Sequence, residues 1–248
     1  MRTTRIHVAL ELGSERELLM PPAASAHLLR VLRLRPGAAL TLFNGQGGEY
    51  AAQLLAAEKG QARVHVGAFS NVERESPLQL RLLQGIARGE RMDLIVQKAT
   101  ELGVNEIVPL SCEFSVVRLA AHALARRQER WQAVANAACE QCGRNRPPAV
   151  REIVELDAAC AGVASGEAGL RLMLVPEASE SLSALARVTL KHATLLVGPE
   201  GGLSGREQLL AQRAGFRACR LGPRTLRTET APIAALAALQ ALAGDLAS

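Results

Sequence analysis

The chain has 248 residues, 48% of them hydrophobic and 21% charged, and this balance excludes a disordered or fibrous protein. Its length suits one large domain or two smaller ones. The formal net charge of +5 favours an anionic partner without requiring one, because many basic proteins bind no nucleic acid.

The arginine, aromatic and cysteine contents indicate which kind of partner the protein binds and in which compartment it is found. Almost all basic residues are arginines, which can grip phosphate with two hydrogen bonds, although codon bias explains the same usage equally well. One Trp, one Tyr and four Phe are too few for an aromatic platform that stacks RNA bases. Five cysteines and a start without an apolar signal-peptide core predict reduced thiols in a cytoplasmic protein. The apolar run 231–243 is too short to span a membrane.

Short apolar runs separated by turn residues dominate the chain as far as residue 69. Strands are predicted at 6–10, 38–43, 49–55 and 62–66, and one helix at 23–34. The sequence Asn44-Gly-Gln-Gly-Gly48, between two of these strands, is typical of a hairpin loop. These features predict a small domain resembling a β-barrel.

A polar segment at 70–77, ending in proline, predicts a domain boundary between residues 72 and 73. Beyond it, strands are predicted at 78–87, 106–110, 170–175, 193–197 and 218–221, and helices at 91–102, 123–142, 204–214 and 231–242. This alternation predicts a parallel α/β sheet with helices on both faces. Ser204 and Glu207 predict a capping box, Gly215 is expected to end that helix, and Thr230 is the expected N-cap of the last one.

Two loops rich in glycine and proline, 198–202 and 221–223, each follow a predicted strand, and a third strand ends nearby at 174–176. Such loops expose main-chain N–H and C=O groups at the carboxyl edge of a parallel sheet, where ligands bind. A plain strand-to-helix turn is the alternative for the first loop, which lacks the spacing of a dinucleotide or phosphate loop. Glu200 is either a functional carboxylate or a charge placed favourably near a helix N-terminus. The polar segment 224–230 is a second part of the site or a solvated loop.

Cysteine and histidine patterns give no metal or nucleophile prediction. Cys139 and Cys142 lack two further ligands at zinc-site spacing and are interpreted as structural. The five histidines are scattered without a metal-ligand or triad pattern. The arginines near these cysteines predict a phosphate-binding surface, although a basic helix end also complements its own dipole.

Several segments together closely resemble the ribosomal RNA small subunit methyltransferase E family of the SPOUT (α/β-knot) superfamily. They are Gln84-Gly-Ile-Ala-Arg-Gly-Glu-Arg-Met92, Gln97-Lys-Ala-Thr-Glu-Leu-Gly-Val104, Cys139-Glu-Gln-Cys-Gly-Arg-Asn-Arg146, Gly198-Pro-Glu-Gly-Gly-Leu-Ser204 and Leu221-Gly-Pro-Arg-Thr-Leu-Arg-Thr-Glu-Thr230, with His27-Leu-Leu-Arg-Val-Leu-Arg33 near the start. The resemblance implies a PUA-like β-barrel at 1–72 and a SPOUT α/β domain with a parallel sheet and a trefoil knot at 73–248, working as a homodimer. The implied activity is methyl transfer from S-adenosylmethionine to N3 of a uridine in 16S ribosomal RNA.

The resemblance also implies site residues. Cofactor contacts are expected from three loops: Leu174, Pro176, Val197, Gly198, Pro199, Glu200, Gly201, Gly202, Leu221, Gly222, Leu226, Arg227 and Thr228. Family members often carry histidine where this chain has Val175, so main-chain contacts carry over there but that side-chain contact does not. Residue chemistry and motif position make Arg227 the expected positioning cation and Glu229 or Glu200 the expected proton acceptor. RNA contacts are expected from Arg2, Arg5, Arg30, Arg33, Arg35, Arg88, Arg144 and Arg146.

Two other functions stay open. One is a SPOUT methyltransferase that acts on another RNA, such as tRNA. The other is a non-catalytic RNA-binding or ribosome-assembly factor that keeps the fold. Intact loops at 198–202 and 224–230 weigh against the second.

Overall fold

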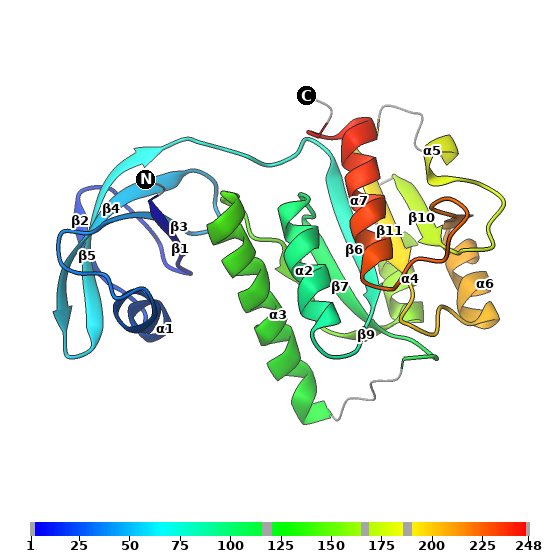
Figure 1. The fold of residues 1–248 in the computed structure, drawn as a ribbon, viewed down its shortest axis with the longest axis horizontal. Coiled ribbons are helices and arrows are strands. Elements are labelled where there is room, and N and C mark those ends of the chain that lie inside the picture. The colour runs from blue at the N-terminus through cyan, green and yellow to red at the C-terminus, as the bar shows by residue number, and fades with distance from the viewer. Residues whose placement is uncertain (1–2, 116–120, 165–168, 186–189, 247–248) are drawn as a thin grey trace. The chain divides into compact units, whose positions relative to one another are not determined.

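The computed structural model describes residues 3–115, 121–164, 169–185 and 190–246 (Figure 1). The chain divides into two compact units. Unit 1 comprises Met1–Glu75 and Cys139–Pro147, and unit 2 comprises Ser76–Ala138 and Pro148–Ser248. The first division lies close to the boundary expected from the sequence. The return of Cys139–Pro147 to unit 1 has no counterpart in the sequence analysis.

Unit 1 is built on a five-stranded sheet in the order β1-β3-β4-β5-β2. The strands are β1 (Thr4–His7), β2 (Arg16–Leu19), β3 (Ala39–Phe43), β4 (Glu49–Glu58) and β5 (Gln61–Ser70). The β1–β3 pair is parallel and the other pairs are antiparallel. The predicted hairpin joins β3 to β4. The sequence analysis missed β2, because its mostly exposed residues give no apolar alternation.

The predicted helix of unit 1 is present but is not a regular α-helix. It consists of α1 (Pro22–Ala26) and a single π-helical turn, η1 (His27–Val31). Arg33 ends the segment with φ of +52°, in the left-handed region. Leu28 is fully buried in the core of unit 1, whereas Val31 is 68% exposed.

Buried polar contacts join Cys139–Pro147 to the rest of unit 1. The Nε of Arg144 donates to both carboxylate oxygens of Glu75 at 3.0 Å. Arg5 donates to the side chain of Asn145 at 2.5 Å, and Asn145 donates to the Val72 carbonyl at 2.6 Å. A buried ion pair that loses one partner is strongly destabilising, so this segment is needed to complete unit 1.

The sheet of unit 2 is entirely parallel among the described residues, as the sequence predicted. Its order is β12-β10-β11-β6-β7-β8, and β9 also pairs with β7. The strands are β6 (Gln79–Gly85), β7 (Glu106–Ser111), β8 (Ala149–Val150), β9 (Val154–Glu155), β10 (Leu170–Leu174), β11 (His192–Val197) and β12 (Arg217–Cys219). The short β8 and β9 were not predicted.

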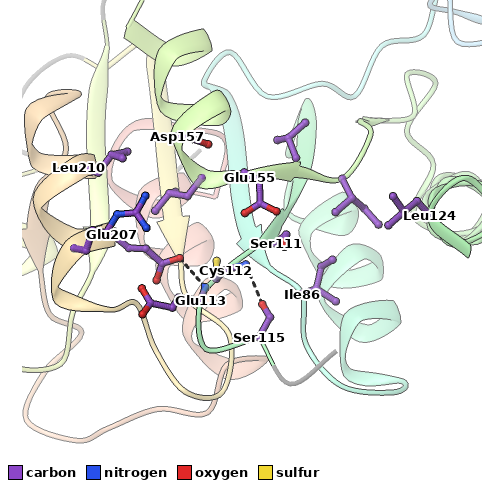
Figure 2. Close-up of a pocket in the computed structure, with 14 residues that line it drawn as sticks. Ile86, Ser111, Cys112, Glu113, Ser115, Leu124, Glu155, Asp157, Glu207 and Leu210 are labelled. Atoms are coloured by element: carbon purple, nitrogen blue, oxygen red, sulfur yellow. Dashed lines mark hydrogen bonds between the residues drawn. The ribbon is translucent and has the colours of Figure 1, made fainter. Parts of the chain in front are cut away.

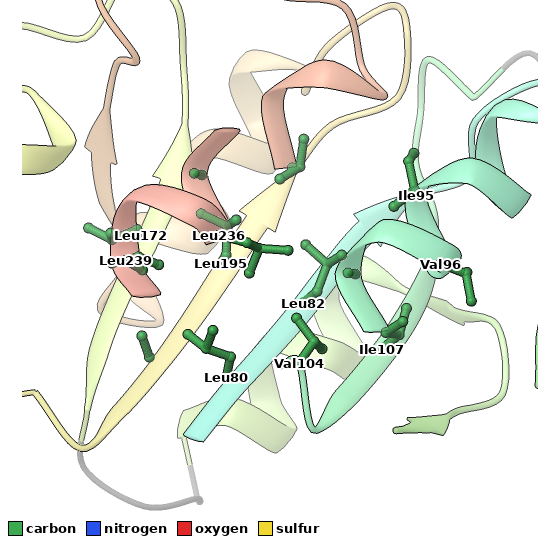
Figure 3. Close-up of a cluster of buried hydrophobic side chains, with 14 of the residues drawn as sticks. Leu80, Leu82, Ile95, Val96, Val104, Ile107, Leu172, Leu195, Leu236 and Leu239 are labelled. Carbon is green, nitrogen blue, oxygen red and sulfur yellow. The ribbon is translucent and has the colours of Figure 1, made fainter. Parts of the chain in front are cut away.

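Adjacent residues of the central strands enter two separate cores, which shows that helices cover both faces of the sheet. Leu82 and Leu195 belong to the core beneath α2 (Arg91–Glu101) and α7 (Thr230–Ala243), shown in Figure 3. Their neighbours Leu83 and Leu196 belong to the core of α4 (Leu156–Ala164) and α6 (Gly205–Arg213). The remaining helices of unit 2 are α3 (Ala121–Cys142), whose last residues enter unit 1, and α5 (Leu182–Leu185). The α/β fold class is therefore confirmed, and the knot stays a prediction.

Helix ends agree with the sequence analysis at α6 but not at α7. Ser204 and Glu207 form the predicted capping box, and Gly215 follows the end of α6 with φ of +86°. The prediction that Thr230 caps α7 was wrong. Thr230 is the first helical residue, Glu229 occupies the N-cap position, and no side chain caps the helix.

The state of the cysteines and the presence of membrane-spanning helices can be read from the described residues. All five cysteines lie within them and are free thiols. Among the described helices, none is both long and apolar enough to cross a membrane.

Candidate active site and cofactor cleft

Three loops at one edge of the parallel sheet enclose a cleft of about 580 Å³. They follow β10, β11 and β12, which are neighbours in the sheet, so their carboxyl ends meet at the same edge. Ligands of open α/β sheets bind outside such strand ends. The arrangement is the one that the Gly/Pro loops predicted.

Nearly all predicted cofactor and catalytic residues line this cleft. The exception is Gly222, whose φ of +76° shapes the third loop from outside the lining. The lining residues among those predicted are Leu174, Pro176, Val197, Gly198, Pro199, Glu200, Gly201, Gly202, Leu221, Leu226, Arg227, Thr228 and Glu229. Val175 lines it too. Its amide donates to the Cys219 carbonyl at 2.9 Å and its carbonyl accepts from the Ala178 amide at 3.1 Å, so both of its main-chain groups are already hydrogen-bonded within the loop.

Glycine is required where the loop after β11 meets the end of β6. A Cβ at Gly85 would lie 2.5 Å from both Cδ and N of Pro199 and 2.8 Å from the carbonyl carbon of Gly198. A Cβ at Gly198 would itself lie 2.8 Å from the carbonyl carbon of Gly202. These glycines allow main chain to pack directly on main chain, which brings this loop against the end of β6.

Buried hydrogen bonds from Thr228 and Gln84 hold the same loops together. The Thr228 hydroxyl donates to the Gly198 carbonyl at 2.9 Å, which links the third loop to the second. The Gln84 amide donates to the Gly85 carbonyl at 2.9 Å and to the Thr228 hydroxyl at 3.5 Å. Thr228 is therefore placed to shape the cleft rather than to react.

Two carboxylates and one arginine meet at the cleft. Nη1 of Arg91 donates to Oε1 of Glu200 at 2.9 Å, and Nε of Arg91 lies 3.8 Å from Oε1 of Glu229. The Arg88 amide also donates to Oε1 of Glu200 at 2.9 Å. Arg91 was not predicted as a site residue. The signal that could have found it is its position just beyond the carboxyl end of β6, at the same sheet edge.

The environment of Glu200 favours its charged form. Burial alone would raise the pKa of this carboxyl. Hydrogen bonds from the Arg88 amide and the Arg91 side chain, with the charge of Arg91, outweigh burial and hold the pKa below its usual value. Of the two roles that the sequence left open for Glu200, the contacts favour a charge that fixes structure, because this carboxylate joins the loop after β11 to Arg88 and Arg91 at the start of α2.

Two buried acceptor atoms near Thr228 have no hydrogen-bond partner within the described structure: Oε2 of Glu229 and Oε1 of Gln84. Buried polar atoms in native proteins are normally paired, so each such atom needs an explanation. Glu229 lines the cleft, where a ligand with N–H or O–H groups would supply a donor. The ammonium and ribose hydroxyls of S-adenosylmethionine are groups of this kind, so the residues present fit that cofactor.

The arginines predicted to contact RNA fall into two groups. Arg30, Arg33, Arg35 and Arg88 are exposed, and the side chain of Arg146 is 51% exposed beside Glu73. By contrast, the side chains of Arg5 and Arg144 are only 8% and 5% exposed and pair with Glu49 and Glu75. Arg5 also lies over the Phe43 ring. This burial removes Arg5 and Arg144 from the arginines we propose to meet RNA, and Arg2 lies outside the described residues.

A second cavity of about 630 Å³ lies at the ends of β7 and β9, beside α4 and α6 (Figure 2). Its carboxylates do not suit a polyanion, and Glu207 is already engaged: it accepts hydrogen bonds from the Glu113 and Ser204 amides at 2.9 and 2.8 Å. Burial, with the charges of Glu207 and Glu155, raises the pKa of the Cys112 thiol to about 12. Cys112 is therefore a neutral thiol and not a nucleophile.

The interpretation of Cys139 and Cys142 as structural can also be compared with the structure. Among the described residues, no three His, Cys, Asp or Glu side chains group as metal ligands. Cys139 is buried at the end of α3, and its pKa is raised by the hydrogen bond with Cys142 and by burial. These observations agree with a structural interpretation of both cysteines.

Comparison with known proteins shows to which family the chain belongs. A profile of the RNA methyltransferase domain matches residues 74–240, and a profile of the RNA methyltransferase PUA domain matches residues 22–67. The chain is 31% identical to ribosomal RNA small subunit methyltransferase E of Bacillus subtilis, with 86% of this chain and 85% of that one covered. The chain belongs to the ribosomal RNA small subunit methyltransferase E family. Its relative from Buchnera aphidicola subsp. Schizaphis graminum is 30% identical over 99% of this chain and 98% of that one.

Solved structures of methyltransferases agree with this family. A methyltransferase from Legionella pneumophila, in complex with bound SAM, is 40% identical with a TM-score of 0.93, over 99% of this chain and 100% of that chain. Ribosomal RNA small subunit methyltransferase E from Neisseria gonorrhoeae, bound to S-adenosyl methionine, is 37% identical with a TM-score of 0.88, over 98% and 99% of the two chains. The family resemblance drawn from the sequence motifs is thereby confirmed.

Proposed function

We propose that this member of the family transfers a methyl group from S-adenosylmethionine to N3 of a uridine in 16S ribosomal RNA. The cleft formed by three main-chain-rich loops at one sheet edge carries the proposal, because Arg227, Glu200 and Glu229 all line it. Relatives of the same family that were solved with the cofactor bound support it.

The cofactor is expected to lie in this cleft. Exposed peptide groups of 198–202 and 221–228 suit a neutral adenine, and the unpartnered Glu229 oxygen suits an ammonium or hydroxyl donor. S-adenosylmethionine supplies an electrophilic methyl group on its sulfonium. The task of the chain's own residues is to hold that carbon and the target nitrogen close and in line, since positioning alone can supply much of the rate.

Proton removal is the second task of the site, because N3 of uracil is mostly protonated at neutral pH. Arg227 is exposed and lines the cleft, so we assign it the role of the cation that positions and stabilises the developing uracil anion. Glu229 or Glu200 accepts the proton. Water is excluded when RNA covers the cleft, which strengthens these charge interactions.

RNA contacts are assigned to the exposed arginines of the two units taken separately. In unit 1 these are Arg30, Arg33 and Arg35, with Arg146 once its exposed pair with Glu73 opens; in unit 2 it is Arg88. Phosphate contacts of this kind make affinity fall steeply as salt rises. A target base in paired or stacked RNA has to turn outward to reach the cleft. We further propose a homodimer that acts in the cytoplasm.

The direct test is transfer of labelled methyl to small subunits and to naked 16S ribosomal RNA from cells that lack this modification. The expected product is 3-methyluridine at one position, identified by mass mapping. Arg227→Ala is expected to lower the rate by about 10²- to 10³-fold, the range for removal of a group that stabilises a developing anion. A wild-type rate in this variant would refute the role of Arg227.

The alternatives predict different outcomes of the same work. A methyltransferase for another RNA would label tRNA and leave ribosomal RNA unlabelled. A non-catalytic assembly factor would show no heat of S-adenosylmethionine binding in calorimetry. The intact cleft argues against the second of these.

A further inference from the structure

Arg91 stands between the two candidate proton acceptors of the cleft. It is the first residue of α2, and its guanidinium contacts carboxylates from two different loops. Nη1 bonds to Glu200 at 2.9 Å, and Nε lies 3.8 Å from Glu229. A single guanidinium group therefore contacts two carboxylates, and the other contacts of these two carboxylates differ as follows.

Glu200 is committed to holding loops together. Its Oε1 accepts hydrogen bonds from both the Arg88 amide and the Arg91 side chain. These two donors stabilise the charged carboxylate, and protonation would weaken both hydrogen bonds. A carboxylate in this position makes a poor proton acceptor.

Glu229 has the opposite set of contacts. Its distance of 3.8 Å from Arg91 is longer than a hydrogen bond, so the guanidinium attracts the carboxylate without occupying it. Oε2 is buried without a partner within the described residues, and the side chain is 16% exposed where it lines the cleft. The Glu229 carboxylate therefore lies beside the guanidinium at the cleft, and its buried Oε2 has no competing donor among the described residues.

When the environments of two carboxylates differ in this way, one typically takes part in proton transfer and the other stays charged and stabilises the structure. We propose, on the basis of the proposed function, that Arg91 is a positioning residue that gives the two carboxylates their different roles. It fixes Glu200 as the anion that clamps the loop after β11 to the loop before α2, and it orients Glu229 as the proton acceptor for methyl transfer.

The step balances in atoms and charge. The N3–H bond breaks and its proton passes to the Glu229 carboxylate. The electron pair left on N3 forms the new N–C bond to the methyl carbon. The C–S bond breaks, and its electron pair stays on sulfur as the neutral thioether of S-adenosylhomocysteine. The proton later leaves Glu229 to solvent, which restores the ion pair with Arg91.

Other charged groups also face this part of the cleft and bear on its pH dependence. Arg227 lies two residues before Glu229, and Arg88 approaches Glu200 through its amide. The remaining charged residues that line the cleft are Glu177, Arg220 and Arg224. Arg91 differs from these groups because, within the described part of the chain, its guanidinium lies within ion-pair distance of both acidic candidates.

The test compares Glu229→Gln, Glu200→Gln, Arg91→Gln and Arg91→Lys by rate against pH and by S-adenosylmethionine affinity in calorimetry. Glu229→Gln is expected to lower the transfer rate by about 10²- to 10⁴-fold and to remove the acidic limb of the pH profile. Arg91→Gln is expected to lower the maximal rate more than it weakens cofactor binding, because Glu229 then loses the cation that orients it. Arg91→Lys restores most of the wild-type rate, since it keeps the charge.

Glu200→Gln supplies the contrast. It is expected to weaken cofactor binding while the shape of the pH profile is kept. Arg217→Gln is the matched control, because it removes an exposed ion pair with Glu180, of 2.7 Å, that lies outside the cleft. Its rate and profile should equal those of the wild type.

Three results would overturn the inference. They are a Glu229→Gln variant that keeps the wild-type rate, a Glu200→Gln variant that alone loses the acidic limb, or an Arg91→Gln variant that keeps the wild-type rate. Failure of the proposed function looks different, because the wild-type protein then transfers no methyl group to ribosomal RNA at any pH. Thermal unfolding of each variant shows whether it is folded.

Discussion

Replacement of Gly85 by alanine tests how the cleft is built. The new Cβ would lie 2.5 Å from N and Cδ of Pro199, whereas carbon atoms in contact are about 3.5–4.0 Å apart. The nearby atoms belong to the main chain and to a proline ring, so no flexible side chain can move aside. The loop after β11 therefore has to shift by about 1 Å, at a cost of about 1–3 kcal/mol for overpacking.

Most of that cost is expected to fall on the cofactor, because the displaced loop lines the cleft. A loss of 1–3 kcal/mol corresponds to roughly 5- to 150-fold weaker binding of S-adenosylmethionine in isothermal calorimetry. Gly162→Ala is the matched control. Gly162 lies in α4, a Cβ there would meet nothing within 4 Å, and alanine favours a helix. The reasoning fails if Gly85→Ala binds the cofactor as tightly as the control does.

Three further variants probe contacts described above. Thr228→Val removes the donor to the Gly198 carbonyl and should weaken cofactor binding by about 1–3 kcal/mol, measured by calorimetry. Glu75→Gln leaves the buried Arg144 without its charged partner and should lower the free energy of unfolding by about 3 kcal/mol in urea titrations. The folded-state pKa of Glu200 is depressed, so the stability it contributes is present above its ordinary pKa of 4.5 and is lost as pH falls through the folded value. The stability difference between wild type and Glu200→Gln should accordingly shrink below about pH 4.5.

Control variants and contradicting results complete these predictions. Thr230→Val changes an exposed threonine at the start of α7 that does not line the cleft, and it should bind the cofactor normally. Glu73→Gln changes a partly exposed pair with Arg146 and should cost less than about 1 kcal/mol. Equal unfolding energies for the Glu75 and Glu73 variants would show that burial does not decide the effect. A stability difference for Glu200→Gln that persists unchanged to pH 3 would exclude the proposed ion-pair linkage.

The sequence predicted the elements that have strong local patterns. The central strands of unit 2 are continuous apolar runs because residues such as Leu82 and Leu83 face two different cores. The capping box of α6 is local as well and was found from Ser204 and Glu207 alone. By contrast, β8 and β9 have two residues each, so no periodicity can mark them.

Long-range contacts account for what sequence reasoning missed at the site. Glu200 and Arg91 are 109 positions apart, and no local pattern signals that they form an ion pair. Arg144 has the composition of a surface residue, and only the approach of Glu75 makes its burial possible. The loops of the cleft were found because their signal is local, namely glycine and proline directly after apolar strands. The family resemblance supplied the cofactor, which local patterns could not specify.

The discontinuity of unit 1 has a consequence for how a newly made chain reaches its native state. Residues up to Glu75 leave the ribosome first, but the unit also needs Cys139–Pro147. That segment is made roughly 70 residues later, or about 4–14 s at ordinary rates of synthesis. During that interval Arg5 lacks Asn145, and Glu75 lacks Arg144. Expression of residues 1–75 alone should therefore yield an incomplete barrel, and a fragment for separate study has to carry the returning segment through an engineered linker.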